Sequence, residues 1–259
     1  MLEIATETRI LRASKLPELL ECPASVILQA LGDPDTSGPE AATGSLVHSG
    51  VAEFHRSGEN KEAGLAALYA AREKFPLGDP TAAEKHYVAY CNDPANRGVE
   101  IVKNEEPLVC RIKAPDWDTT GQGDIVIRGT LDQIRRYPGK QDAVCDIKTG
   151  KTFYGEFAIR HYAPQQAAYT VGAWQTWGLD VRPGPLICTD GYFRRNGQVH
   201  WWQPWDRSHC EVILEYVAVV IAAARMGFVG VSPGTRCGLC KFKGPENCLP
   251  KLRSIRDGN

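Results

Sequence analysis

The sequence has no apolar segment long enough to cross a bilayer, no secretory signal and no internal repeat. No uninterrupted apolar run approaches the ~20 residues that a membrane-spanning helix needs. The first residues, MLEIATETRILRAS, lack the basic start and the apolar stretch of a signal peptide. Low-complexity tracts are missing as well. We therefore expect a cytoplasmic protein without a membrane segment.

An excess of charge is also missing. Thirty Lys and Arg residues face 31 Asp and Glu residues, for a net charge of −1. This balance argues against a protein that coats nucleic acid, but an enzyme needs only a local positive groove. With 259 residues, 43% of them hydrophobic, the chain is long enough for one or two domains with a sizeable core.

Cysteine, by contrast, is abundant, with nine residues. A reducing compartment argues against a disulfide framework. Five of the cysteines lie among apolar or strand-like residues, and we interpret these as buried structural thiols: Cys91, Cys110, Cys145, Cys188 and Cys210. Near the C-terminus, TRCGLCKFKGPENCLP spaces Cys237, Cys240 and Cys248 as C-x₂-C-x₇-C. Thiolates spaced in this way can bind one metal centre, with Cys22 as the candidate for a fourth ligand.

The hydrophobic pattern predicts an α/β protein with a helical N-terminal part. A helix capped by Ser14 is expected over RASKLPELLECPASVILQAL, a loop over DPDTSGPEAATG, and a second helix from about Ser45. Two more helices follow, and strand patterns begin after Gly98. A helix over residues 163–177, a hairpin that turns at Asn196-Gly197 and a final helix complete the chain. We divide it into residues 1–97, 98–205 and 206–259, closing into one compact unit.

Two carboxylates fall on predicted strands with apolar neighbours. Asp132 lies in GTLDQI and Asp146 in CDIKTGK. If these strands pair as a hairpin, both carboxylates reach the same end of the sheet, and a charged Asp there is costly unless something pairs with it. Mg²⁺ or Mn²⁺ prefers such oxygen ligands. Lys148 points to the same face as Asp146, because side chains alternate along a strand. The alternative is a surface Asp–Lys pair before a glycine turn.

Other motifs occur in a fixed order around this pair. Gly44-x-x-x-His48 precedes Gly129-x-x-Asp132, then Asp146-Ile147-Lys148-Thr149-Gly150-Lys151, then Gln165-x-x-x-Tyr169. This order resembles the RecB-like exonuclease branch of the PD-(D/E)xK nuclease superfamily. The resemblance implies a restriction-endonuclease-like mixed central sheet flanked by helices. It also implies that His48, Asp132, Asp146 and the Ile147 carbonyl bind Mg²⁺ or Mn²⁺. Lys148 would be the catalytic lysine, and Gln165 and Tyr169 would orient it and the DNA backbone.

The distribution of one N-terminal cysteine and three C-terminal cysteines is similar to that in AddB-type nuclease subunits and CRISPR-associated RecB-like exonucleases. There, four such cysteines bind an iron–sulfur cluster that acts as a clasp between the two ends of the chain. That resemblance implies a 4Fe–4S cluster on Cys22, Cys237, Cys240 and Cys248. Structural zinc is the alternative, although it usually draws on two local pairs. A cluster here would act as a staple between the two ends of the chain.

The sequence therefore predicts a metal-dependent DNA exonuclease that prefers single-stranded ends. Phage recombination and CRISPR adaptation are the settings that the resemblance suggests, with proteins of those processes as partners. Lys151, Arg194 and Arg195 are weaker candidates for DNA contacts. Two alternatives stay open, namely a non-cutting DNA-binding or assembly scaffold on the same fold, and a structure-specific endonuclease.

Overall fold

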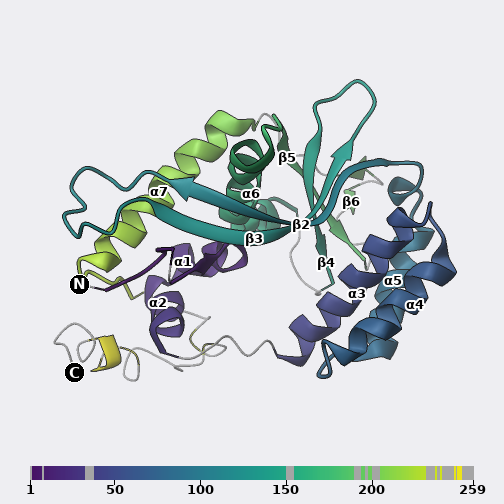
Figure 1. Cartoon of the computed structure of the whole chain (residues 1–259), viewed down its shortest axis with the longest axis horizontal. Helices are drawn as coiled ribbons and strands as arrows, with labels where there is room; N and C mark the ends of the chain where they lie inside the picture. Colours follow the sequence, from purple (N-terminus) through teal and green to yellow (C-terminus); the bar gives the residue numbers. More distant parts are fainter. Residues whose placement is uncertain are drawn as a thin grey trace.

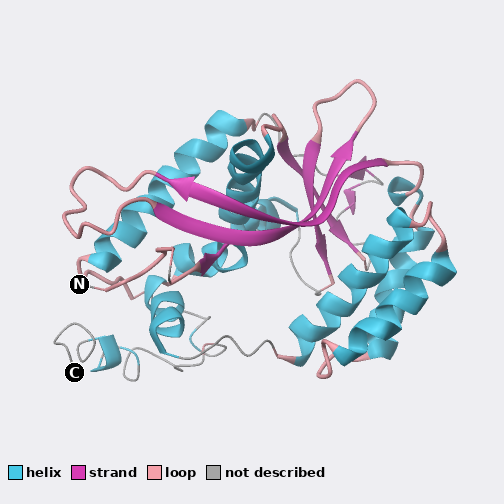
Figure 2. Ribbon diagram, in the orientation of Figure 1, coloured by secondary structure: helices cyan, strands magenta, loops and turns pink. Residues whose placement is uncertain are grey.

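The computed structural model describes residues 2–7, 9–32, 38–149, 155–189, 194–195, 198–199, 205–231, 237, 240, 248 and 250–252. One mixed sheet forms its centre, and helices flank it (Figure 1). Figure 2 shows helices α3, α4 and α5 as a group at one end of the sheet, apart from α6 and α7. This arrangement is consistent with the expected restriction-endonuclease-like fold.

Strand β3 is the centre of the sheet. It pairs antiparallel with β2 along one edge, while its other edge pairs parallel with β1 and antiparallel with β4. Strand β5 lies parallel to β4 on the far side. The strands are β1 (Leu11–Arg12), β2 (Glu100–Ile112), β3 (Ile125–Arg136), β4 (Ala143–Lys148) and β5 (Arg182–Cys188). A separate pair, β6 (Arg194–Arg195) and β7 (Gln198–Val199), forms the predicted hairpin ladder.

Seven helices are found in the described residues, with three short 3₁₀ turns at Ala13–Lys15, Ala71–Glu73 and Pro94–Asn96. The helices are α1 (Leu16–Glu21), α2 (Pro23–Gly32), α3 (Pro39–Arg56), α4 (Lys61–Ala70), α5 (Pro80–Asn92), α6 (Gly155–Trp177) and α7 (Arg207–Arg225). None of these helices is both long and apolar enough to cross a membrane. Helices α6 and α7 pack together, and α6 also contacts β2.

Two apolar clusters hold these elements together. The larger one joins the N-terminal residues, strands β2 and β3, and helices α6 and α7. The smaller one joins α3, α4 and α5, and it includes Ile147 from β4. Ile147 therefore fixes the helical group against the same strand that carries Asp146 and Lys148. The smaller cluster also includes Val47 and Val51, so it fixes the orientation of α3 around His48.

Several predicted element boundaries are wrong. The expected helix capped by Ser14 is two helices, because Cys22 has an extended backbone (φ −151°, ψ 91°) and precedes Pro23. A residue before proline is sterically disfavoured in the helical conformation. Helix α1 has Lys15 at its N-cap and no side-chain cap. Helix α3 begins at Pro39, inside the expected loop, and α6 begins at Gly155 and contains Pro164.

A buried arginine ties the N-terminal segment to the end of α7. The Arg225 side chain is 0% exposed and pairs with Asp118, which is 2% exposed. Its guanidinium donates hydrogen bonds to the Asp118 carboxylate and to four carbonyl oxygens, those of Ile4, Ala5, Gly123 and Asp124. The Leu2 N–H in turn donates to the Arg225 carbonyl at 2.9 Å. The Arg225 side chain thus satisfies backbone carbonyls from two separate segments and pairs with a carboxylate from a third.

Candidate active site

Strands β3 and β4 bring the two predicted aspartates together. Gln133 pairs with Cys145 in the antiparallel ladder, which places Asp132 beside the Asp146–Ile147 peptide. The Ile147 N–H donates a hydrogen bond to Asp132 Oδ2 at 2.6 Å. Both carboxylates are buried, at 6% exposure for Asp132 and 2% for Asp146. The expected hairpin and the expected convergence of the two carboxylates are therefore confirmed.

Lys148 lies on the same face of β4 as Asp146. Its Nζ lies 2.7 Å from Asp146 Oδ2, and it donates a hydrogen bond to Gln165 Oε1 at 3.3 Å. The Tyr162 ring supports the same ammonium group, with its centroid 4.4 Å from Nζ. Such a cation–π contact stabilises a charged, partly desolvated lysine. Tyr162 was not predicted from the sequence, although it lies in HYAPQQ, directly before Gln165.

Helix α6 supplies the next pair of residues. Gln165 Nε2 donates to Asp146 Oδ1 at 3.1 Å and lies 3.2 Å from the Tyr169 hydroxyl. The spacing of one helical turn puts both side chains on the helix face toward β4. Gln165 therefore bridges Asp146 and Lys148, because its oxygen accepts from the lysine while its nitrogen donates to the carboxylate.

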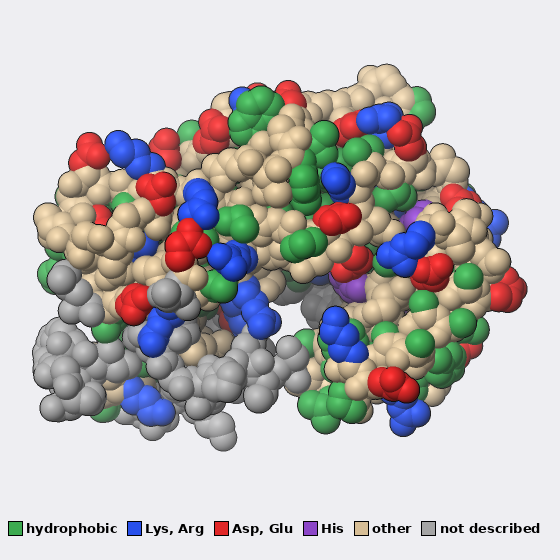
Figure 3. Space-filling model, in the orientation of Figure 1, with side chains coloured by type: hydrophobic (Ala, Val, Ile, Leu, Met, Phe, Trp, Pro, Cys, Tyr) green, Lys and Arg blue, Asp and Glu red, His purple; other side chains and the backbone are tan. Residues whose placement is uncertain are grey.

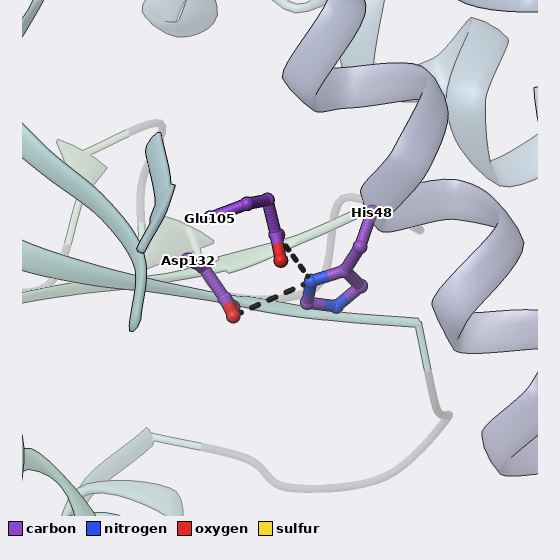
Figure 4. Close-up of side chains that lie close together, drawn as sticks. All are labelled: His48, Glu105 and Asp132. Carbon is purple, nitrogen blue, oxygen red and sulfur yellow. Dashed lines mark hydrogen bonds and ion pairs between the residues drawn. The ribbon is translucent and has the colours of Figure 1, made fainter. Parts of the chain in front are cut away.

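His48 approaches from α3 on the opposite side. Its Nδ1 lies 2.9 Å from Glu105 Oε1 and 3.3 Å from Asp132 Oδ1 (Figure 4). Among the described residues, His48, Glu105 and Asp132 are the only three His, Cys, Asp or Glu side chains with ligand atoms all within 4.8 Å of one another. The predicted convergence of His48 on Asp132 is confirmed, but the third member is Glu105.

The sequence reasoning missed Glu105. It lies on β2 with φ +52°, a left-handed conformation that is uncommon for a residue other than glycine. Strained backbone of this kind tends to occur where a functional side chain must be aimed. The only sequence signal is a pair of glutamates before a proline, in NEEPLVC. The structure has one continuous strand β2 across this point.

The ionisable side chains of the site have shifted pKa values, and the shifts differ in direction. Burial alone would lower the pKa of His48, but Asp132 and Glu105 outweigh it and hold this pKa well above its usual value. Burial favours the neutral form of Asp132, yet His48 and Lys148 keep its pKa low. For Asp146, burial and the neighbouring Asp132 together raise the pKa to about 6. Two buried carboxylates with different affinities for a proton are typical of a functional site.

Close packing explains why glycine occupies positions 44 and 129 of the motifs. A Cβ at Gly44 would lie 3.2 Å from Thr149 Oγ1, at the end of β4. A Cβ at Gly129 would lie 2.7 Å from Tyr169 Cε1 and 3.1 Å from the Ala13 Cβ. The glycines thus let α3 approach the end of β4 and let the Tyr169 ring lie against β3.

Substituting Gly129 with alanine tests whether this position must be glycine for Tyr169 to pack against β3. In Gly129→Ala, the added methyl group has to displace the Tyr169 ring, because the Ala13 side of the space is already tight. We expect a loss of stability of ~1–3 kcal/mol from overpacking, measured as the free energy of unfolding in denaturant. Gly230→Ala is the control for stability, because the nearest atom to its Cβ position, Pro23 Cγ, lies at an ordinary contact distance of 3.8 Å. A free energy of unfolding equal to that of the wild type would contradict this packing role.

Four of the five cysteines that we interpreted as buried structural thiols are buried in the structure. Cys91, Cys110, Cys145 and Cys210 are each 0% exposed, which confirms them as buried thiols, while the Cys188 side chain lies outside the described residues. The four cysteines of the expected clasp form no group with sulfurs all within 4.8 Å of one another in the described part of the chain. A single tetrahedral zinc, bound at ~2.3 Å from each sulfur, needs its ligands that close.

The structure describes the other predicted site residues less completely. Lys151 lies outside the described residues, and Arg194 and Arg195 are described only as strand β6. The Ile147 carbonyl was predicted as a metal ligand, and its N–H is the group that contacts Asp132. Its role as a ligand stays a prediction.

A family model matches most of the chain. The family model described as "PD-(D/E)XK nuclease superfamily" matches residues 11–244. A search of curated proteins gives no match. One similar solved structure is titled "Crystal structure of SSO0001"; it is 18% identical, with a TM-score of 0.36, over 79% of this chain and 85% of that chain.

Proposed function

The chain belongs to the PD-(D/E)XK nuclease superfamily, and on that basis we propose that it is a Mg²⁺- or Mn²⁺-dependent DNA exonuclease of the RecB-like branch. The observation that carries the proposal is the Asp146–Lys148 pair, 2.7 Å apart, beside the group of His48, Glu105 and Asp132. An acid and a lysine at this distance, next to a cluster of possible metal ligands, are the groups that phosphodiester hydrolysis needs.

The side chains fit a divalent cation. Asp132, Asp146 and Glu105 offer carboxylate oxygens, which Mg²⁺ and Mn²⁺ prefer, and His48 adds one nitrogen. Among the described residues, the buried Asp146 Oδ2 accepts no hydrogen bond and has the Lys148 ammonium 2.7 Å away, so its lone pairs are not all used. A bound cation would supply positive charge that polarises the phosphate and favours deprotonation of a nearby water.

Lys148 would stabilise the negative charge that develops on the phosphate oxygens. Burial alone would lower its pKa, but Asp146, Tyr162 and Asp132 raise it, so the amine stays protonated. Such a preorganised charge acts most strongly where water is excluded. Gln165 acts as a positioning residue, since it contacts both Asp146 and Lys148, and Tyr169 positions Gln165 by accepting a hydrogen bond from its amide.

The choice between exonuclease and endonuclease can be tested with substrate topology. We propose single-stranded ends as the substrate, so linear single-stranded DNA labelled at its 5′ or 3′ end should lose label while a circular single strand of the same sequence stays intact. Cleavage of the circle, or of branched duplexes alone, would instead favour the structure-specific endonuclease. Tight binding without any cleavage would favour the non-cutting scaffold, although such a scaffold has no need of Lys148.

We further propose a 4Fe–4S cluster on Cys22, Cys237, Cys240 and Cys248. Burial raises the pKa of Cys248, and the nearby Cys22, Cys240 and Cys237 thiols raise it further. Cys240 Sγ also contacts Ser25 Oγ at 3.7 Å, and the Ala24 N–H donates to the Gly230 carbonyl at 3.0 Å. These contacts bring the segment that follows Cys22 next to Gly230 and Cys240. A cluster would join them covalently through iron.

Loss of one clasp cysteine tests the cluster. We expect Cys237→Ala, purified anaerobically, to lose the brown colour and most of its iron, and to unfold at a lower temperature because the staple between the chain ends is gone. Cys210→Ala removes a buried thiol elsewhere and should keep the iron. Wild-type protein that is colourless and carries one equivalent of zinc would contradict the cluster.

By the same resemblance, we propose that the protein acts in the cytoplasm, in recombination, repair or CRISPR-adaptation-like processing of DNA. Co-purification with proteins of these processes from its host would support this setting.

A further inference from the structure

A cavity of about 820 Å³ opens beside the candidate metal ligands. One face of helix α3 forms its first wall, the end of α4 and the turn after it form the second, and strands β2 and β3 form its floor. Figure 3 shows lysine and arginine side chains on both sides of the hollow between the sheet and the α3–α5 group. This volume is within the range of pockets that bind organic ligands, and far larger than one cation needs.

The cavity is continuous with the site. His48, Glu105 and Asp132 are part of its lining. Anything that fills the cavity therefore lies directly against the residues that would hold the cation. A phosphodiester bound at the site would have to continue into this space or leave it on the opposite side, where α6 carries Gln165 and Tyr169.

The far part of the cavity has a different character. Lys74 and Phe75 lie side by side there, with Lys74 Nζ 5.4 Å from the centre of the Phe75 ring. Phe75 is half-buried and packs against the apolar cluster of α3–α5, while Lys74 is exposed. The aromatic ring is therefore held in place by the core behind it, and the exposed ammonium of Lys74 is accessible to an anion.

Arg56 adds a second cation to the same cavity. It pairs with Glu53 one turn earlier on α3, and its side chain is 64% exposed. Exposed pairs of this kind contribute only ~0–1 kcal/mol, so a phosphate can compete with Glu53 for the guanidinium. An aromatic face next to cations that can reach phosphates is the chemistry of sites for single-stranded nucleic acid.

We propose that this cavity binds the unpaired nucleotides next to the scissile phosphate, with Phe75 stacking on a base and Lys74 and Arg56 contacting the backbone. The inference rests on the proposed nuclease function and specifies its substrate. An unpaired base has a free face for Phe75, whereas a base inside a duplex is stacked on both faces. The cavity thus selects single strands over duplex at the site itself.

Measuring the binding of single-stranded DNA under conditions that prevent cleavage tests the proposal. Anisotropy of a fluorescent oligothymidine is measured in EDTA, so that no metal-dependent reaction occurs, over a series of salt concentrations. We expect Phe75→Ala to weaken binding by roughly 5- to 150-fold, the equivalent of ~1–3 kcal/mol for one stacked base. Lys74→Ala should reduce the slope of log K against log salt by about 0.7, the value for one phosphate contact on a single strand.

Matched controls separate this effect from damage to the fold. Tyr69→Ala removes an exposed aromatic on α4, and Lys85→Ala an exposed lysine on α5; neither residue lines the cavity. Phe75→Leu keeps the apolar packing but removes the stacking face, so it should weaken binding without a change in melting temperature.

Two results would overturn the proposal. One is that the Phe75 and Lys74 variants bind like Tyr69→Ala and Lys85→Ala, and the other is equally tight binding of a blunt duplex by wild-type protein. If the wild type cuts DNA in Mn²⁺ while these variants bind normally, the cavity proposal fails and the nuclease proposal stands. If the wild type binds through Phe75 and Lys74 but never cuts, the nuclease proposal fails instead.

Discussion

Replacing Lys148 with alanine is expected to lower the rate of DNA cleavage by ~10²–10³-fold, the usual loss when one preorganised charge or donor at a reacting group is removed. DNA binding in EDTA should stay close to wild type, because the side chain is mostly enclosed by Asp146, Gln165 and Tyr162. Single-turnover cleavage of a labelled single strand in Mn²⁺ measures the first effect, and anisotropy measures the second.

The protein should still fold without this lysine. Asp146 would lose its ion-pair partner, but burial already raises its pKa to about 6, so it can become neutral by taking up a proton. Lys148→Met, which keeps most of the apolar stem, gives a second variant with less effect on packing. Lys113→Ala is the control, since Lys113 pairs with Asp116 on the surface, where its side chain is 83% exposed. Full activity in both Lys148 variants would show that this residue has no role in catalysis.

Arg225→Met is expected to have the largest effect on stability, a loss of about 3–5 kcal/mol. The substitution leaves Asp118 without its buried partner, together with four carbonyl oxygens that now have no donor from this side chain. Denaturant unfolding, with the slope compared between variants, measures the change. Because the contacted segment spans Ile4 and Ala5, protease cleavage near the N-terminus should accelerate at the same time.

A surface arginine provides the matched comparison. Arg136 pairs with Glu100 and Asp142 at the end of β3, and its side chain is 50% exposed. Arg136→Met should therefore cost no more than ~1 kcal/mol. A similar loss for both variants would mean that burial of the Arg225 network does not matter for stability.

The sequence predicted the parts of the site that depend on local periodicity. Alternation along a strand put Asp146 and Lys148 on one face, and one helical turn put Gln165 and Tyr169 together; the structure has both pairs in contact. Antiparallel pairing of β3 and β4 followed from the short connection between them. These relations span few residues, so the chain's own geometry determines them.

Contacts between distant segments were out of reach. Glu105 comes to His48 through an irregular backbone at φ +52°, which no residue pattern announces. Tyr162 lies under Lys148 only because α6 begins as early as Gly155, ahead of Pro164. The break at Cys22 was signalled by Pro23, but the apolar periodicity on either side favoured one continuous helix.

The central claim is that the Asp146–Lys148 pair and the neighbouring carboxylates form a metal-dependent nuclease site. The most direct measurement is loss of label from linear single-stranded DNA, with anaerobically purified wild type in Mn²⁺, wild type in EDTA, and Asp146→Asn in Mn²⁺. We predict cleavage in the first reaction and none in the other two. Cleavage that persists in Asp146→Asn, or tight binding with no cleavage of single- or double-stranded DNA by the wild type, would contradict the claim.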